Sequence, residues 1–351
     1  MSYQALKAAL GRPFDPTPPS SELAACHVRY SELTGADVEG DLRRALAGFG
    51  RLGVTGVSGS GKSSLVRFSV DLDARFAPIY VNVATEQHEL VRDPRGFLDV
   101  LITHLADRAR DVAKLTEEQR FELLRDGTLS TPIPGITRTS KAEFGGGWML
   151  TGKIAEDLAT ALPASDGYRN VEQLARTANV ALDHIRAYDL VPVLVADDTD
   201  RILRLPNADT AKLFDGFFGE VLRTLADHVV DLAIVVAVHD AYRADPDLGY
   251  DEKVSGLIEQ HIAVPHLTEA GHIEGVLEAR TAFVPGDVPQ PYRAAEIFHA
   301  AAVGELAALH RGPHRFDLRH TLTTAHSAIA LAVDDSADLV ERRHVQAADA
   351  S

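Results

Sequence analysis

The chain of 351 residues carries a formal net charge of −16, with 45% hydrophobic and 25% charged residues. The length allows two domains with a sizeable core, and the composition is that of an ordinary globular protein. The acidic balance excludes a generally basic nucleic-acid-binding surface, the lone Cys26 excludes an internal disulfide, and no apolar run could cross a bilayer, so we expect a cytoplasmic protein without membrane contact.

The first expected element is an N-terminal arm over residues 1–39. Its stretch PFDPTPPSS, at 13–21, cannot form a regular helix because proline fixes φ and lacks the backbone N–H. The segment DVEGDLRRALAGFG, at 37–50, has the apolar spacing of an amphipathic helix that ends in glycine. We therefore expect the first folded domain to begin at about residue 40.

A glycine-rich loop follows the apolar stretch RLGVTG, at 51–56, which predicts a buried strand. From Gly56 to Ser63 the chain reads GVSGSGKS and satisfies G-x-x-x-x-G-K-[ST] at every fixed position. In this motif backbone N–H groups at a helix N-terminus hold phosphates, Lys62 reaches the β- and γ-phosphates, and the Ser63 hydroxyl binds Mg²⁺. The residues predicted to bind ATP are Gly56, Val57, Ser58, Gly59, Ser60, Gly61, Lys62, Ser63 and Ser64.

Further elements alternate between strand and helix. The β-branched run APIYVNVAT, at 77–85, predicts a second buried strand, and residues 94–113 show helical apolar spacing. The sequence TEEQ, at 116–119, is a capping box for a short helix that ends at Gly127.

An irregular region rich in glycine, proline and threonine comes next, at 127–167. Between residues 130 and 153 it combines basic and aromatic residues with three consecutive glycines: Arg138, Lys141, Phe144, Trp148 and Lys153. One interpretation is a contact loop for a nucleic-acid strand or a protein partner, through charge and stacking. The other is a hairpin whose aromatic side chains pack on the sheet.

The second half supplies the acids that a phosphate loop needs. After a helix over 170–190, the apolar strand VPVLVADDTDR, at 191–201, ends in carboxylates. We assign Asp197 to the Mg²⁺ side and Asp198 to the attacking water, as catalytic base. Asp200 fits a helix N-cap or a solvated turn.

A helix over 208–229 and the strand LAIVVAVHD, at 232–240, complete the alternation, and from about His266 the chain is almost wholly helical. Strands that alternate with helices predict a parallel sheet. The predicted fold is therefore a three-layer α/β core over 40–265 followed by a small helical lid domain over 266–351. At the strand end, His239 is either a contact to the γ-phosphate or attacking water, or a satisfied strand-end histidine.

These motifs resemble those of an AAA+ ATPase, a phosphate-loop NTPase, from about Asp37 to the end of the chain. IAVPHLTEAGHIEGVLEAR and HRFDLRHTLTTAHSAIALAV, at 262–280 and 314–333, are similar to the last core strand and lid helices of the Orc1/Cdc6-like clade. The resemblance implies that His239 is the sensor-1 residue and Arg319 the sensor-2 arginine, with Arg315 as the competitor. It also implies ATP and Mg²⁺ between core and lid, and a homo-oligomeric ring or filament.

The chain departs from that pattern in three ways. The spacing from Lys62 to Asp197 is long for such a core, which marks 127–167 as an insertion. No winged-helix domain is expected after the lid. No arginine stands at the usual place of the trans-acting finger, for which Lys253, Arg243 and Arg223 are substitutes. A metal site at His310, His314 and His320 is not expected, because Gly312 and Pro313 break the helix between the first two.

The expected function is ATP binding and hydrolysis to ADP and phosphate, coupled to oligomer assembly or to remodelling of a protein or nucleic-acid partner. Phage defence, transposition and DNA handling are settings that suit such an ATPase. The alternative is a nucleotide-gated switch or adaptor that turns ATP over slowly and recruits a partner.

Overall fold

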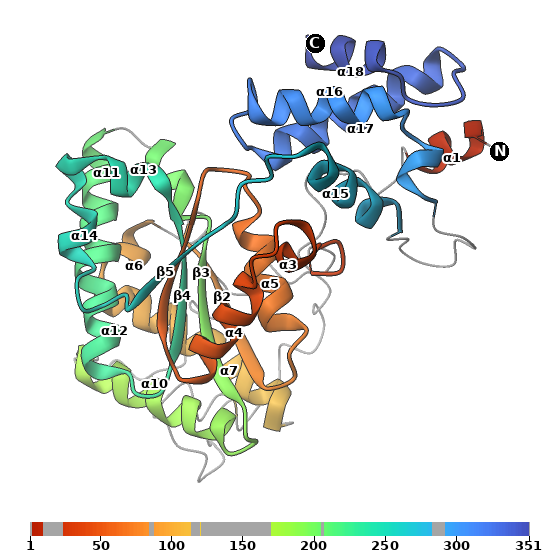
Figure 1. Cartoon of the computed structure of the whole chain (residues 1–351). Coiled ribbons are helices and arrows are strands. Elements are labelled where there is room, and N and C mark those ends of the chain that lie inside the picture. The colour runs from red at the N-terminus through yellow and green to blue at the C-terminus, as the bar shows by residue number, and fades with distance from the viewer. Residues whose placement is uncertain are drawn as a thin grey trace, which may run out of the picture.

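A computed structural model describes residues 2–9, 24–83, 88–113, 120, 170–204, 207–282 and 292–350 (Figure 1). The predictions made for 13–21, for the capping box at 116–119 and for the insertion at 127–167 lie outside these residues, and so do the five basic and aromatic residues of that insertion.

The centre of the fold is a five-stranded sheet in which every pairing is parallel. Its strands are β1 (Arg51–Gly56), β2 (Phe76–Asn82), β3 (Val191–Asp197), β4 (Ala233–His239) and β5 (Gln260–Ala263), in the order β2-β3-β4-β1-β5. Because the strands are parallel, β1, β3 and β4 all finish at the same end of the sheet, which is called its carboxyl end below. The predicted α/β fold class is confirmed.

Helices cover both faces of the sheet, as Figure 1 shows. In the first part of the chain, counting both faces together, these helices are α3 (Tyr30–Leu33), α4 (Val38–Ala47), α5 (Lys62–Asp71), α6 (His88–Arg92) and α7 (Pro94–Ala113). Further along come α10 (Val171–Arg186), η2 (Thr199–Arg204), α11 (Asn207–Phe214), η3 (Asp215–Val221), α12 (Leu222–His228), α13 (Asp240–Ala244), η4 (Pro246–Leu248) and α14 (Tyr250–Lys253).

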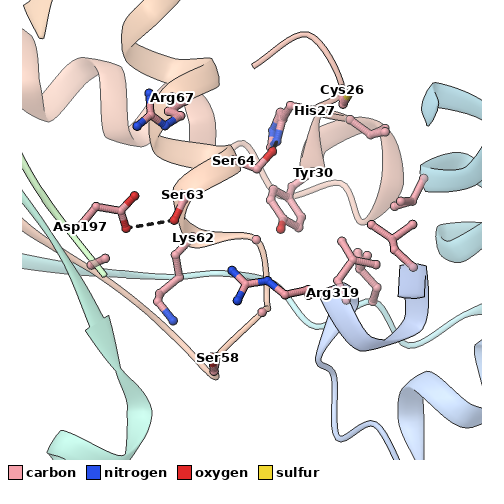
Figure 2. Close-up of a pocket in the computed structure, with 18 of the residues that line it drawn as sticks. Cys26, His27, Tyr30, Ser58, Lys62, Ser63, Ser64, Arg67, Asp197 and Arg319 are labelled. Carbon is pink, nitrogen blue, oxygen red and sulfur yellow. Dashed lines mark hydrogen bonds between the residues drawn. The ribbon is translucent and has the colours of Figure 1, made fainter. Parts of the chain in front are cut away.

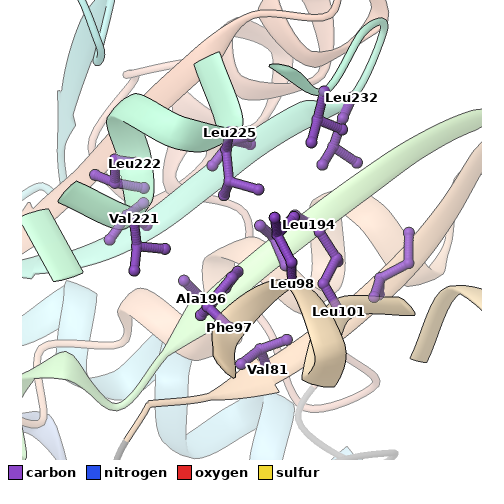
Figure 3. Packing of buried hydrophobic residues seen from close by; sticks show 14 of the residues in the cluster. Val81, Phe97, Leu98, Leu101, Leu194, Ala196, Val221, Leu222, Leu225 and Leu232 are labelled. Carbon is purple, nitrogen blue, oxygen red and sulfur yellow. The ribbon is translucent and has the colours of Figure 1, made fainter. Parts of the chain in front are cut away.

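Two apolar clusters hold these layers together. One joins one face of the sheet to α7, α10 and α12, with Leu101, Leu194 and Leu225 among its buried residues (Figure 3). The other joins the opposite face to α4 and α5 and continues into the carboxyl-terminal helices. The three central strands β1, β3 and β4 therefore bury both of their faces, which explains their unbroken apolar runs in the sequence, whereas the edge strand β5 is largely exposed.

The helix predicted over 208–229 is interrupted in the structure. Its middle, Asp215–Val221, is a π-helix between α11 and α12. Phe214, Phe217 and Phe218 are all fully buried there, and each has an aromatic ring contact within the group that also includes Tyr242. Phe214, Phe217 and Phe218 have the i, i+3, i+4 spacing that places side chains on one side of an ordinary α-helix, so their burial alone does not account for the wider turn.

The carboxyl-terminal part contains α15 (Ala270–Ala282), η5 (Ala294–Glu296), α16 (Ala300–Arg311), α17 (Leu318–Asp334) and α18 (Arg342–Asp349). Apart from an isolated bridge between Phe298 and Val340, the described residues after β5 form helices and turns, as predicted. The short helix α1 (Ser2–Ala9) lies beside α17 in Figure 1. It buries Leu6 in the apolar cluster that extends from α4 and α5 into the carboxyl-terminal helices. The expected arm is thus partly helical.

Candidate nucleotide-binding site

The predicted phosphate loop connects the end of β1 to the start of α5. Gly59 and Gly61 have φ values of +74° and +103°, which side chains other than glycine rarely adopt. Gly61 is the N-cap of α5, and the structure shows no side chain capping this helix end. The N–H groups of the first turn of α5 are therefore available to an anion at the site.

Lys62 is held inside this loop, with only 6% of its surface exposed. Its Nζ donates hydrogen bonds of 2.9 Å to both Gly56 O and Val57 O, and it pairs with Asp200 Oδ2 at 3.0 Å. A buried ammonium requires such partners, because an unpaired charge away from water is costly. Asp200 is therefore the counter-ion of Lys62 in this structure, rather than a solvated turn residue.

Ser63 and Asp197 meet at the head of the loop. The Ser63 hydroxyl donates a 2.9 Å hydrogen bond to Asp197 Oδ1, drawn as a dashed line in Figure 2. Burial raises the pKa of the Asp197 carboxyl, although hydrogen bonds from the Asp198 N–H and from Ser63 act in the opposite direction. A hydroxyl beside a carboxylate offers the oxygen ligands that Mg²⁺ prefers, so these two residues fit the predicted metal.

Asp198 takes an unusual backbone conformation directly after β3. Its φ is +59°, and its carboxylate accepts a 2.7 Å hydrogen bond from Asn82 Nδ2 at the end of β2. The sequence analysis missed Asn82. The signal for it exists only once β2 and β3 are known to be neighbours, because their register pairs Asn82 with Asp197.

A cavity of about 320 Å³ lies over the loop, between the sheet edge and the carboxyl-terminal helices (Figure 2). Four cationic residues belong to its lining: Lys62, Arg67, Arg280 and Arg319. Arg280 on α15 is 7% exposed, and the Arg67 guanidinium stacks over the Tyr80 ring at 4.0 Å. Three carboxylates, those of Asp197, Asp198 and Asp200, line the same cavity, so it combines the cations that bind an anionic ligand with the oxygen atoms that bind a metal ion. Neither Arg67 nor Arg280 was predicted.

The structure separates the two candidates for the sensor-2 arginine. Arg319 lines the cavity, and Figure 2 shows its side chain extending from α17 toward the loop. Arg315 lies in the turn before α17, with φ +48°, and is not among the lining residues described. The geometry favours Arg319.

His239 is not among the described lining residues either. Its Nδ1 accepts a 3.0 Å hydrogen bond from the Ala241 N–H and so caps α13. Burial lowers the pKa of His239, while the Asp200 carboxylate opposes that shift. Of the two interpretations of His239 made from the sequence, the Nδ1 contact fits the satisfied strand-end histidine.

The lid contacts the phosphate loop directly. The N–H groups of Leu318 and Arg319, in the first turn of α17, lie 3.1 and 3.3 Å from Gly59 O. Asp317, which caps this helix through a 3.0 Å hydrogen bond from His320 N, lies so close that a Cβ at Gly59 would stand 2.6 Å from its Cγ. A shift of the loop relative to α17 would therefore break these contacts.

The segment before α4 closes another side of the cavity. His27 joins Ser64 Oγ at 3.1 Å to Glu39 Oε1 at 2.9 Å, and Glu39 also accepts the Tyr30 N–H at 2.6 Å. Burial alone would raise the pKa of Glu39, but these hydrogen bonds lower it below its ordinary value. Cys26, His27 and Tyr30 line the cavity, so part of the predicted arm belongs to the site.

Comparison with solved structures finds the Aeropyrum pernix ORC2 protein in two nucleotide states. The structure titled as ADPNP-ADP complexes matches with a TM-score of 0.48 and 14% identity, over 92% of this chain and 67% of that chain. The ADP form matches with the same TM-score and identity, over 93% and 69%. No family model and no curated protein matches the sequence. Among the described residues, no helix has the length and apolarity to cross a membrane.

Proposed function

We propose that the protein binds ATP with Mg²⁺ at this site and hydrolyses it to ADP and phosphate. The observation that carries the proposal is the contact between Ser63 of a complete phosphate loop and Asp197 at the end of β3. Both residues lie at the carboxyl end of the parallel sheet, beneath a cavity whose lining includes four cationic residues. Turns at the carboxyl ends of the strands are where parallel α/β sheets bind ligands.

In this proposal the residues divide the work. The loop N–H groups and Lys62 bind phosphate oxygens, which replace Asp200 as the partner of the Lys62 ammonium. Ser63 and Asp197 hold Mg²⁺, which neutralises charge on the phosphates when bound. Asp198 orients the attacking water and accepts its proton, while Asn82 fixes the position of the Asp198 carboxylate.

Arg319 links the nucleotide to the lid. Its guanidinium reaches the phosphates from α17, and the backbone of the same turn is hydrogen-bonded to Gly59 O. A change at the γ-phosphate therefore acts on both contacts of the lid with the loop. We propose that this coupling, between a core at 40–265 and a lid at 266–351, transmits the nucleotide state to a homo-oligomer or to a remodelled partner.

A homo-oligomer would complete the site with a cation from a neighbouring subunit. Arg243 and Lys253 form ion pairs inside the chain, with Asp251 at 3.3 Å and with Asp215 at 3.2 Å. Arg223 is exposed on α12 and is our first candidate for the trans-acting residue. Within the insertion, residues 130–153 remain the proposed contact for a protein or DNA partner.

The second candidate is a slow nucleotide-gated switch. The observation that favours it is the engagement of both acids after Asp197: Asp198 is held by Asn82, and Asp200 by Lys62. In this second proposal both contacts hold the acids away from the attacking water and must rearrange before hydrolysis. An aspartate at position 198 also reaches less far than a glutamate would.

Single-turnover hydrolysis of radiolabelled ATP tests the proposal. We expect one phosphate released per chain, and we expect Asp198→Asn to retain ATP but lose hydrolysis by about 100-fold or more, because general-base catalysis is worth ~10²–10⁴. Hydrolysis by Asp198→Asn at the wild-type rate would remove Asp198 from the mechanism. A wild-type chain that binds ATP and releases no phosphate would support the switch.

A further inference from the structure

A second cluster of ligating side chains lies in the lid, outside the nucleotide cavity. His314 in the turn after α16, His320 in α17 and Asp349 in the last turn of α18 place their ligand atoms within 4.8 Å of one another. The sequence analysis expected no metal here because Gly312 and Pro313 break the helix. The break instead folds His314 back beside α17. We propose that these three residues bind one divalent transition-metal ion of the zinc class.

His314 is already held in a ligand's position. Its side chain is 0% exposed, and its Nε2 lies 2.8 Å from Asp349 Oδ1. On the other side of the ring, Nδ1 lies 3.1 Å from Thr321 Oγ1, which is also 3.0 Å from the Asp317 carbonyl. Metal-binding histidines are usually oriented in this way, by a hydrogen bond at the nitrogen that does not bind the metal. The Nε2 atom of His314 is thus hydrogen-bonded to Asp349, and a metal ion would replace the shared proton with both atoms as its ligands.

The other two ligands are exposed and can adjust. The His320 ring stacks on the His314 ring at a centroid distance of 4.0 Å and an interplanar angle of 14°. Two ligands of one tetrahedral zinc ion lie ~3.4 Å apart, because each Zn–N distance is ~2.0–2.1 Å. The ligand atoms, which lie within 4.8 Å of one another, must therefore approach by up to about 1.4 Å. The exposed His320 ring must also turn out of the stack, because a metal ion lies in the plane of each imidazole that binds it, and the buried His314 can stay in place.

The donor set selects the kind of metal. Two imidazoles and one carboxylate suit Zn²⁺, Co²⁺ or Ni²⁺, whereas Mg²⁺ prefers oxygen ligands alone. Three protein ligands leave a fourth position for water or another ligand.

The cluster lies next to the turn of α17 that contacts the phosphate loop. His320 directly follows Arg319, and its N–H donates to the N-cap residue Asp317. A bound ion would join the end of α18 to the first turn of α17, the turn that contacts the phosphate loop. Metal binding itself does not depend on the proposed ATPase activity.

The test is calorimetric titration of chelator-treated, nucleotide-free full chain with Zn²⁺. We expect one ion per chain, and an affinity at least ~10-fold weaker in both His320→Ala and Asp349→Asn, since each removes a ligand. His228→Ala is the matched control, because His228 is an exposed histidine at the end of α12. Exposed ligands are changed because His314→Ala risks the fold.

Two outcomes would overturn the proposal: no Zn²⁺ binding stronger than that of a chain lacking both His320 and Asp349, or equal Zn²⁺ affinity in wild type, His320→Ala and His228→Ala. Because the titration contains no ATP or Mg²⁺, a failure here leaves the proposed ATP site untouched, and failure of ATP binding leaves this site untouched.

Discussion

Replacing Gly59 by alanine should loosen the lid from the phosphate loop. A Cβ at this position meets the Asp317 carboxylate of the lid, and the backbone φ of +74° disfavours any side chain. The left-handed conformation costs about 1–2 kcal/mol. Displacing Asp317 costs its cap on α17, about 1 kcal/mol more. We therefore expect Gly59→Ala to lower the free energy of unfolding by roughly 2–3 kcal/mol.

Gly256 separates these two contributions. Its φ is +73°, but a Cβ there meets nothing within 4 Å, so Gly256→Ala should cost only the backbone part, about 1–2 kcal/mol. Urea unfolding of both variants measures the difference, and combining Gly59→Ala with Asp317→Ala should remove the cost of the collision. Equal destabilisation by Gly59→Ala and Gly256→Ala, in the presence of Asp317, would refute the proposed contact of lid and loop.

Three further predictions concern the site. Asp200→Asn should destabilise the nucleotide-free chain by roughly 1–3 kcal/mol, because it leaves the buried Lys62 ammonium without its counter-ion. The same variant should bind ATP more tightly in a calorimetric titration, because the phosphates no longer compete with the Asp200 carboxylate for Lys62. Arg319→Ala should weaken ATP binding several-fold with little change in urea unfolding, whereas Arg315→Ala should leave ATP affinity unchanged; the reverse order would exchange their roles. Burial raises the pKa of Asp197, so this carboxyl favours the folded state at low pH and disfavours it as the pH rises through its folded pKa. At acidic pH, Asp197→Asn should therefore have the same urea midpoint as wild type. At neutral pH without Mg²⁺, its urea midpoint should be higher than that of wild type, and equal midpoints at both pH values would contradict this.

The sheet and the phosphate loop could be predicted because their signals are local. The apolar runs of β1, β3 and β4 are short, continuous and bounded by turns, which is typical of strands buried on both faces. The motif from Gly56 to Ser63 fixes the loop, and Asp197 follows from its place at a strand end. Local pattern did not predict the π-helix at Asp215–Val221, because Phe214, Phe217 and Phe218 have the i, i+3, i+4 spacing of an ordinary amphipathic helix.

The missed residues depend on contacts distant in sequence. Asn82 reaches Asp198 only because β2 lies next to β3, and the partner of Lys62 is 138 residues away at Asp200. His27 lies in a segment whose sequence shows no regular pattern, and its role follows from the contacts with Ser64 and Glu39. A single sequence holds no signal for such pairs.

The central claim is that the loop at Gly56–Ser63 binds the phosphates of ATP, and a calorimetric titration of the full chain with ATP and Mg²⁺ tests it most directly. Wild type should bind one ATP per chain. Lys62→Ala should lose at least about 30-fold in affinity, since truncating one partner of a buried charge pair costs ~2–5 kcal/mol. Lys212→Ala, at an exposed lysine of α11, should bind as wild type does. Equal ATP affinity in Lys62→Ala and Lys212→Ala, or no ATP binding by wild type, would contradict the account.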